Sequence, residues 1–287
     1  MRSRSQPHAE PKLVRRNLII VLIASIIASS SLVIFSNTIE AKTLYSDMIE
    51  PLATLTAVGL ASLVVYRQKL DGLIGKVYAS LAIGLVLWFI AEVIWSYYEV
   101  VMGIEIPTPS PADALWLIGY APFMYYIFRM FRFFNRSPNR YDVIIVSIAA
   151  AIYLIFIIDA ALEVSDFSAQ NSIIKFFVNI AYPILDVILI VPAALMILDS
   201  ARKDDGGRRS GKLVSIPWIF LSFIIITIAD SGFVYSSNAG WRQDIIWIWT
   251  PFYISGCLVM AAGLFWHNRF FVFDEKKAVK RWQQEHR

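Results

Sequence analysis

Eight long apolar segments limit what this chain of 287 residues can fold into. The hydrocarbon core of a bilayer is about 30 Å thick, and a helix needs about 20 apolar residues to cross it. The segments that meet this requirement are 17–36, 50–66, 76–99, 111–131, 142–162, 173–198, 213–236 and 245–267. The connections between them are short. We therefore expect an all-α integral membrane protein with eight transmembrane helices.

The segment 17–36 has one alternative interpretation, because a basic stretch precedes it as in a secretory signal peptide. The apolar run is long for a signal peptide, and no convincing small-residue cleavage site follows it. We therefore expect this segment to remain in the protein as a membrane span.

Composition agrees with a membrane protein and argues against several other classes. Apolar residues make up 57% of the chain, above the roughly 45–50% of soluble domains. The net charge of +4 does not indicate a nucleic-acid partner, because the basic residues lie at the predicted helix ends. The single Cys257 gives no disulfide framework or cysteine metal site, and no nucleotide-binding or HExxH motif is present. We expect no cofactor.

Basic residues predict the orientation of the spans. All but three of the 26 Lys and Arg residues fall within or near alternate connections and the two tails. The three exceptions are Lys42, Lys175 and Arg242. Cytoplasmic loops carry an excess of Lys and Arg, so we expect a cell-membrane protein with both termini in the cytoplasm.

A spaced pattern at 91–120 recurs at 229–251 and indicates an internal duplication. Each copy holds an Ala-acid pair, an aromatic residue, a Tyr and an Asp-x-x-Trp motif. The matched positions are Glu92 and Asp230, Trp95 and Phe233, Tyr97 and Tyr235, Asp113 and Asp244, and Trp116 and Trp247. The pattern predicts two parallel four-helix repeats, at 17–134 and 142–271. A linker at 135–141 joins them, and charged tails occupy 1–16 and 272–287.

Four carboxyl groups are predicted to lie within the spans, on Glu92, Asp159, Asp186 and Asp230. A charged side chain at the centre of a membrane helix costs about 2.5–3.5 kcal/mol on insertion scales, so such residues are candidates for function. One interpretation is a neutral carboxyl that bonds to a neighbouring helix. The other is a polar cavity for a ligand, an ion or a proton. Both stay open at this stage.

Aromatic residues gather at the predicted outer surface, where they are either ordinary membrane anchors or the mouth of a binding site. Together with the intramembrane acids they form our candidate ligand-binding set. Its members are Glu92, Trp95, Tyr97, Trp116, Tyr120, Asp186, Asp230, Tyr235 and Trp247. Asp113 has a structural alternative, since Ser110-Pro111-Ala112-Asp113 predicts a capping box at a helix start.

The motif Ala181-Tyr182-Pro183-x-x-Asp186-x-x-Leu189 resembles one in the multi-pass membrane sensor regions of prokaryotic signalling proteins. In those proteins the sensor region precedes a diguanylate cyclase or histidine kinase domain. Ala229-Asp230 followed by Tyr235, and Asp244-x-x-Trp247, are similar to the same family. The resemblance implies a sensor without an output domain of its own, since the tail 272–287 holds no such domain.

We therefore expect a non-enzymatic sensor or regulatory module, in contact with membrane lipids. It would bind a small or apolar ligand and signal to a cytoplasmic protein through 272–287. A proton-coupled or small-molecule transporter is the first alternative, because parallel repeats with polar groups at mid-membrane occur in transporters. A structural subunit of a membrane complex is the second. An intramembrane enzyme ranks last, because the sequence shows no nucleophile-base pair.

Overall fold

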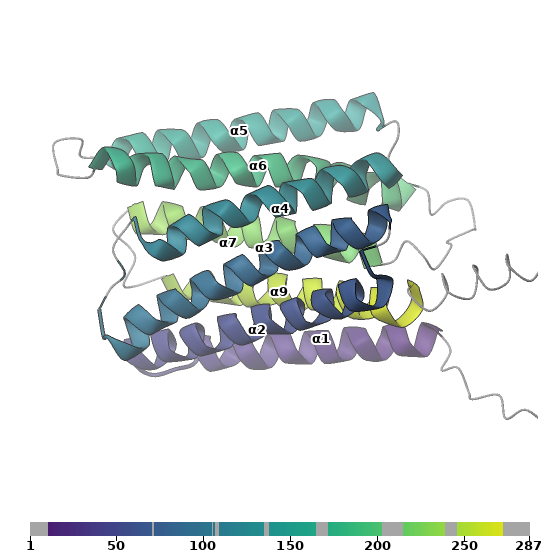
Figure 1. Ribbon diagram of the computed structural model, residues 1–287. Coiled ribbons are helices and arrows are strands. Elements are labelled where there is room, and N and C mark those ends of the chain that lie inside the picture. The colour runs from purple at the N-terminus through teal and green to yellow at the C-terminus, as the bar shows by residue number, and fades with distance from the viewer. Residues whose placement is uncertain are drawn as a thin grey trace, which may run out of the picture.

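The protein is a bundle of long, roughly antiparallel helices (Figure 1). The computed structural model describes residues 11–70, 72–104, 106, 109–134, 138–164, 172–202, 215–238 and 246–271. The long helices are α1 (Pro11–Ile34), α2 (Ile39–Gln68), α3 (Leu73–Ser96), α4 (Pro111–Phe134), α5 (Arg140–Val164), α6 (Ser172–Arg202), α7 (Ser215–Asn238) and α9 (Thr250–Trp266). Short helical turns are η1 (Tyr97–Val101), η4 (Ile246–Ile248) and η5 (His267–Phe271).

Within the described residues, six helical segments are long and apolar enough to cross a membrane. They are Leu13–Ile34, Ile39–Gln68, Leu73–Val101, Arg140–Asp159, Ile173–Ser200 and Ser215–Ser236. Helices α4 and α9 coincide with the predicted spans 111–131 and 245–267 but are not among these six. The six long, apolar helices support the prediction of an all-α membrane protein.

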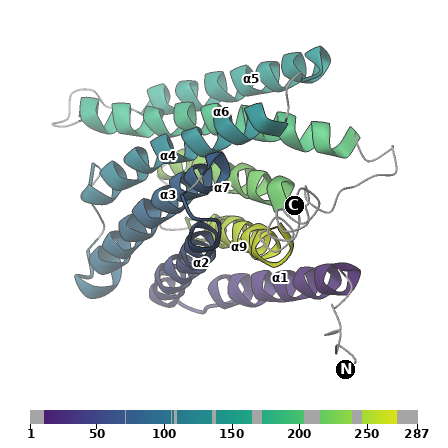
Figure 2. The ribbon, with the colours of Figure 1, turned by 45° about the vertical axis from the view of Figure 1, so that its right-hand side comes forward.

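The central helices pack in pairs, and two helices lie at the edges. Helix α3 packs along α4, α7 packs along α9, and α2 lies between α3 and α9. Helix α6 contacts α4 and α7, while α5 lies outside α6 and α1 lies outside α9 (Figure 2). Helices α1 and α5 expose apolar side chains such as Ile20 and Ile152. In a bilayer these side chains would face lipid, which is as apolar as they are.

The start of α2 differs from the prediction that this span opens at residue 50. The helix begins at Ile39, where the Thr38 side chain accepts a hydrogen bond from the Ala41 amide at 3.1 Å. Pro51 therefore lies inside the helix and leaves the carbonyl oxygen four residues earlier, that of Asp47, without its usual amide donor. Ser96 Oγ lies 2.7 Å from this oxygen and donates to it. A side chain of α3 thus supplies the hydrogen bond that the Asp47 carbonyl oxygen lacks because of Pro51.

Aromatic side chains fill the centre of the bundle. The buried rings of Trp88, Phe123 and Phe223 form a chain of edge-to-face contacts, with centroid distances of 4.8 Å and 5.2 Å. Aromatic pairs prefer this geometry. The chain runs from α3 through α4 to α7, so it joins helices from the first and second parts of the sequence.

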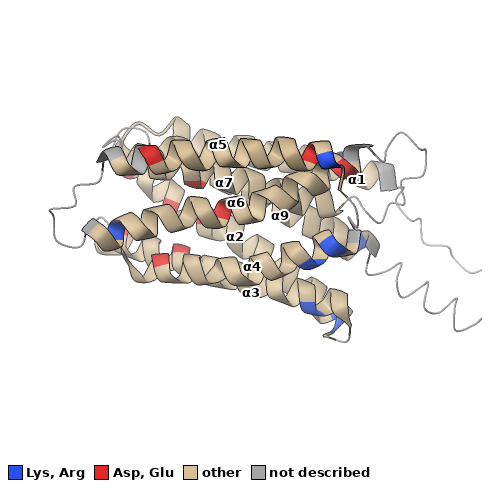
Figure 3. Ribbon diagram, turned by 90° about the horizontal axis from the view of Figure 1, so that it is seen from above, with Lys and Arg blue, Asp and Glu red and all other residues tan. Residues whose placement is uncertain are grey.

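Charge is distributed unevenly along the bundle axis. Figure 3 shows Lys and Arg concentrated where α4 ends and α5 begins, the end that the sequence predicts to be cytoplasmic. Glu92, Asp113 and Asp230 lie towards the other end, since they come from the end of α3, the start of α4 and the second half of α7. The candidate site lies in this acidic half.

Candidate functional site

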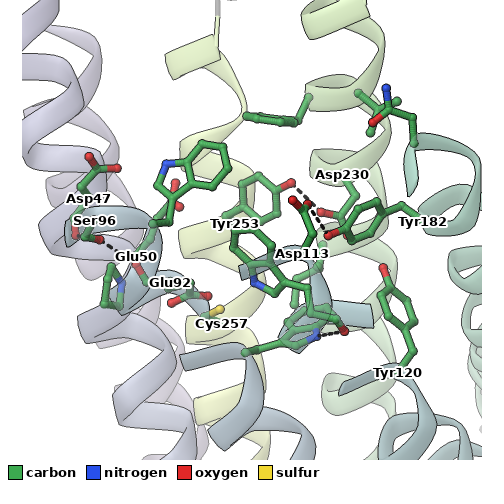
Figure 4. A pocket seen from close by; sticks show the side chains of 18 of the residues that line it. Asp47, Glu50, Glu92, Ser96, Asp113, Tyr120, Tyr182, Asp230, Tyr253 and Cys257 are labelled. Carbon is green, nitrogen blue, oxygen red and sulfur yellow. Dashed lines mark hydrogen bonds between the residues drawn. The ribbon is translucent and has the colours of Figure 1, made fainter. Parts of the chain in front are cut away.

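A cavity of about 140 Å³ lies between the helices in the acidic half of the bundle (Figure 4). Its walls come from the first half of α2, the start of α4, α6 and α9, and from the second half of α3 and α7. Helices that lie far apart in the sequence therefore build one site.

Five carboxyl side chains line the cavity: Asp47, Glu50, Glu92, Asp113 and Asp230. Figure 4 shows Glu50 and Glu92 on one side and Asp113 and Asp230 on the other, with Tyr253 between the two groups. The only basic side chain among the described lining residues is that of Lys175. The lining is therefore rich in hydrogen-bond acceptors and poor in positive charge.

Tyrosine hydroxyls hold the acids of the α4, α6 and α7 side. Tyr182 donates to Asp113 Oδ1 at 2.9 Å, and Tyr253 donates to Asp230 Oδ1 at 2.5 Å. Behind the wall, Tyr120 donates to Asp186 Oδ1 at 2.7 Å. Buried polar groups in proteins are normally hydrogen-bonded, and here each pair joins two different helices.

Asp113 also starts helix α4, as the sequence predicts. The Ser110 amide donates to Asp113 Oδ2 at 2.7 Å, and the Asp113 amide donates to Ser110 Oγ at 3.2 Å. This reciprocal arrangement is a capping box, so that prediction is confirmed. The second carboxylate oxygen of Asp113 bonds to Tyr182, which gives the residue a role at the cavity wall as well as in the cap.

Oδ2 of Asp186, behind the wall, has no hydrogen-bond partner among the described residues. Among the acids that line the cavity, those on the α2 and α3 side are the less completely bonded. Thr54 Oγ1 donates to Glu92 Oε1 at 2.9 Å and lies 3.3 Å from the Cys257 sulfur. Oε2 of Glu92 and Oδ2 of Asp47 are buried and have no hydrogen-bond partner among the described residues. Ser96 Oγ lies within 2.9 Å of the backbone oxygens of both Asp47 and Glu92. The two acids therefore lie on directly adjacent turns of α2 and α3.

Aromatic rings form the remaining walls. Trp95 packs against Trp116 at 5.6 Å between ring centroids and against Phe233 at 5.9 Å. Trp88 lies 5.6 Å from Tyr120, and its Nε1 donates to the carbonyl oxygen of Trp116 at 3.1 Å. The cavity thus combines an apolar, aromatic surface with a few oriented polar groups, as small-molecule sites generally do.

Five of the nine candidate residues from the sequence line this cavity: Glu92, Trp95, Trp116, Tyr120 and Asp230. Asp186 lies directly behind the wall, bonded to Tyr120. The structure therefore brings these six side chains together from α3, α4, α6 and α7.

The other three candidates lie elsewhere. Tyr97 is exposed and packs against Tyr98, and Tyr235 stacks on Phe156 at 5.8 Å. Trp247 lines a smaller neighbouring cavity of about 70 Å³, where the Lys42 ammonium lies 3.7 Å from its ring centroid.

The sequence also named two further acids, Asp159 and Asp244. Asp159 is exposed on α5. Asp244 lies outside the described residues, as do residues 135–137 of the linker, the first ten residues and the tail 272–287.

Sequence reasoning missed several lining residues, above all Asp47, Glu50, Tyr182 and Tyr253. The predicted span opens at residue 50, so Asp47 lies outside it. A helix start signal was present, since Thr38 is a good N-cap residue and neither Gly nor Pro occurs at 39–50. The tyrosines carried no local signal that links them to their acids.

No group of three or more His, Cys, Asp and Glu side chains in the described part of the chain is arranged to hold a metal ion. The site can accept hydrogen bonds, balance a positive charge and cover an apolar surface. Comparison with models of known protein families, with curated proteins and with solved structures finds no match.

Proposed function

We propose that this protein is a sensor-like or regulatory membrane module that binds a small molecule in the cavity between α2, α3, α4, α6, α7 and α9. The cavity is the main support for this proposal. Side chains from α2, α3 and α4, in the first part of the chain, and from α6, α7 and α9, in the second part, enclose one space with aromatic walls and oriented polar groups. A ligand there would contact both parts at once and would change how they pack. The proposed role needs no catalysis by the protein itself.

We further propose eight spans in two parallel repeats, at 17–134 and 142–271. The packing supports this, because α3 pairs with α4 as α7 pairs with α9, and α2 contacts α9 as α6 contacts α4. The matched residues Trp95 and Phe233 also touch, at 5.9 Å. Residues related by a two-fold axis meet in this way when they lie close to the axis. Binding sites at a repeat interface are typical of repeat-built membrane proteins.

The sensor role is supported by the resemblance carried by Tyr182, Pro183 and Asp186. In the structure Tyr182 lines the cavity and Asp186 lies behind its wall, so two residues of the motif belong to the site. Signalling would then require a cytoplasmic partner, which we propose to bind the tail 272–287. Deleting 275–287 is expected to abolish recruitment of that partner and to leave ligand binding intact. Unchanged recruitment would rule out this route.

The binding proposal is tested by native mass spectrometry of the protein purified in native-lipid discs. We expect a small molecule to be retained by the wild type and to be lost in Glu92→Gln and Asp230→Asn. Glu40→Gln is the matched control, because Glu40 is an exposed acid that does not line the cavity. A protein partner with no retained small molecule would contradict the proposal and favour a structural subunit.

A transporter is the second candidate, and the carboxyl groups in the cavity favour it, since such groups carry protons in many transporters. Uptake of the retained molecule into proteoliposomes under a proton gradient separates the two functions. Uptake that stops in Glu92→Gln or Asp230→Asn would indicate transport, and binding without uptake would indicate a sensor.

A further inference from the structure

The two sides of the cavity differ in how their acids are bonded. Asp113 and Asp230 each accept a hydrogen bond from a tyrosine hydroxyl. On the opposite side, Oδ2 of Asp47 and Oε2 of Glu92 are buried and have no partner among the described residues. Asp47 as a whole is only 8% exposed. An unpaired buried polar atom in a native structure requires an explanation, such as a missing ligand.

Oδ2 of Asp47 and Oε2 of Glu92 are each open to a hydrogen-bond donor bound on this side of the cavity. The two residues lie on adjacent turns, since Ser96 Oγ lies 2.7 Å and 2.9 Å from their respective backbone oxygens. Glu50 lies near them and lines the cavity on the same side (Figure 4). An ammonium group carries three N–H donors and a positive charge, so one such group can bond to several of these carboxyls.

Other chemical classes fit this arrangement less well. An anion would face five lining acids and the single lysine Lys175. A metal ion would need a set of at least three ligands, and no such set is arranged for a metal in the described part of the chain. A neutral molecule would place no positive charge beside the five lining acids.

The aromatic walls complete the match to an organic cation. Trp88, Trp95, Trp116 and Phe233 line the same space as the acids. Aromatic faces attract ammonium groups and cover apolar carbon equally well. The cavity volume of about 140 Å³ is close to the roughly 150 Å³ that accommodates a benzene molecule in an engineered protein cavity. The occupant is therefore about the size of one ring or a short alkyl chain.

We propose that the cavity selects a small primary or secondary organic amine in its protonated form. Its ammonium group would bind beside Asp47 and Glu92, and its carbon body would pack against the tryptophans. This inference rests on the proposed ligand-binding function and adds the chemical class of the ligand. A quaternary ammonium is disfavoured, because it lacks the N–H donors that the two free oxygens require.

Titration calorimetry of the full-length protein in lipid discs tests this proposal with probes of matched shape. The amines are butylamine, benzylamine and phenethylamine. Phenethyl alcohol is the neutral counterpart and hydrocinnamate the anionic one. At least one amine is expected to bind, and phenethylamine is expected to bind roughly 10- to 100-fold more tightly than phenethyl alcohol. That ratio is typical when a charge-assisted hydrogen bond is lost.

Variants then assign the bound ammonium to its partners. Asp47→Asn and Glu92→Gln are each expected to weaken amine binding by roughly tenfold or more and to leave phenethyl alcohol binding unchanged. Glu40→Gln, on the exposed start of α2, is expected to behave as the wild type. Equal loss of amine and alcohol binding in a variant would show a damaged cavity, and the wild-type probe series then decides the question without it.

The outcomes separate this inference from the function on which it rests. Phenethyl alcohol or hydrocinnamate binding as tightly as the amines would overturn the amine class and preserve the ligand-binding role. A retained molecule that is neutral or anionic, with no amine binding, would do the same. Failure of all five probes together with no retained molecule would overturn both proposals.

Discussion

Replacing Gly119 by alanine is expected to destabilise the bundle and to disturb the cavity at the same time. The added Cβ would lie 2.6 Å from Cδ1 and 2.8 Å from Nε1 of Trp88. Ordinary carbon contacts are about 3.5–4.0 Å. The indole cannot move aside easily, because Nε1 donates to the Trp116 carbonyl and the ring packs against Phe123 at 4.8 Å. Trp88 lines the cavity, so its displacement would reach the ligand.

The size of the effect follows from three contributions to the free energy of unfolding. Overpacking a close-packed interior costs about 1–3 kcal/mol. If the indole shifts enough to break its hydrogen bond to Trp116, a further cost of about 0.5–1.5 kcal/mol is added. Alanine offsets about 0.8–1.0 kcal/mol through its higher helix propensity. With all three contributions, the net loss expected for Gly119→Ala is about 0.5–3.7 kcal/mol.

Unfolding by SDS in mixed micelles, followed by circular dichroism, measures this difference. Gly59→Ala is the matched control, because nothing lies within 4 Å of the Cβ that it would add. Helix propensity alone then acts, so Gly59→Ala is expected to be neutral or more stable by up to about 1 kcal/mol. If Gly119→Ala matches Gly59→Ala in stability and keeps the wild-type amount of bound ligand, the argument that Trp88 is fixed against Gly119 is wrong.

Three further results are expected. Ser110→Ala removes the capping box and should lower the free energy of unfolding in the same SDS titration by about 0.5–2 kcal/mol. Tyr120→Phe takes a donor from the buried Asp186 and should cost about 1–3 kcal/mol there. With the single native cysteine changed to serine, Ile104→Cys should react with an impermeant maleimide on intact cells. Leu70→Cys should react only after lysis, because Lys and Arg predict a cytoplasmic position for it.

The controls are the same substitutions at positions where the side chain is exposed or bonds only within its own helix. Tyr66→Phe matches Tyr120→Phe, because Tyr66 is 83% exposed. Ser36→Ala matches Ser110→Ala, because Ser36 donates only to a carbonyl of the preceding turn. Loss of stability no larger than in these controls would contradict the two stability predictions. Reaction of the Leu70 variant on intact cells would contradict the orientation.

Local patterns in the sequence predicted the helices and the start of α4. The apolar runs at 76–99 and 173–198 correspond to α3 and α6 within a few residues, because the bilayer fixes the length of a span. The Ser110 to Asp113 box is likewise local, since its partners are three residues apart. The exception is the start of α2. The span was predicted from its apolar residues alone, and the helical turns before Pro51 contain polar residues, so they were left out.

The candidate site was predicted only in part. Whether a candidate residue lies at the cavity depends on the reason for which it was chosen. Four carboxyls were found because a carboxyl within an apolar run is costly. Three of them, Glu92, Asp186 and Asp230, belong to the cavity or to its wall, whereas Asp159 is exposed on α5. Tyr97 and Tyr235 were included as aromatic residues at matched positions near the predicted outer surface, and both lie outside the cavity. A shared spacing shows which positions correspond but not which way each side chain points.

The sequence by itself determined that this is a helical membrane protein and which of its carboxyls lie in apolar surroundings. Only the tertiary structure decided which hydroxyl meets which carboxyl, since Tyr182 and Asp113 are 69 residues apart and Tyr120 and Asp186 are 66 apart. It also decided that Asp47 and Glu92 keep unpaired oxygens on one side of the cavity. These pairings depend on the crossing and register of packed helices, which arise from the fit of many side chains at once.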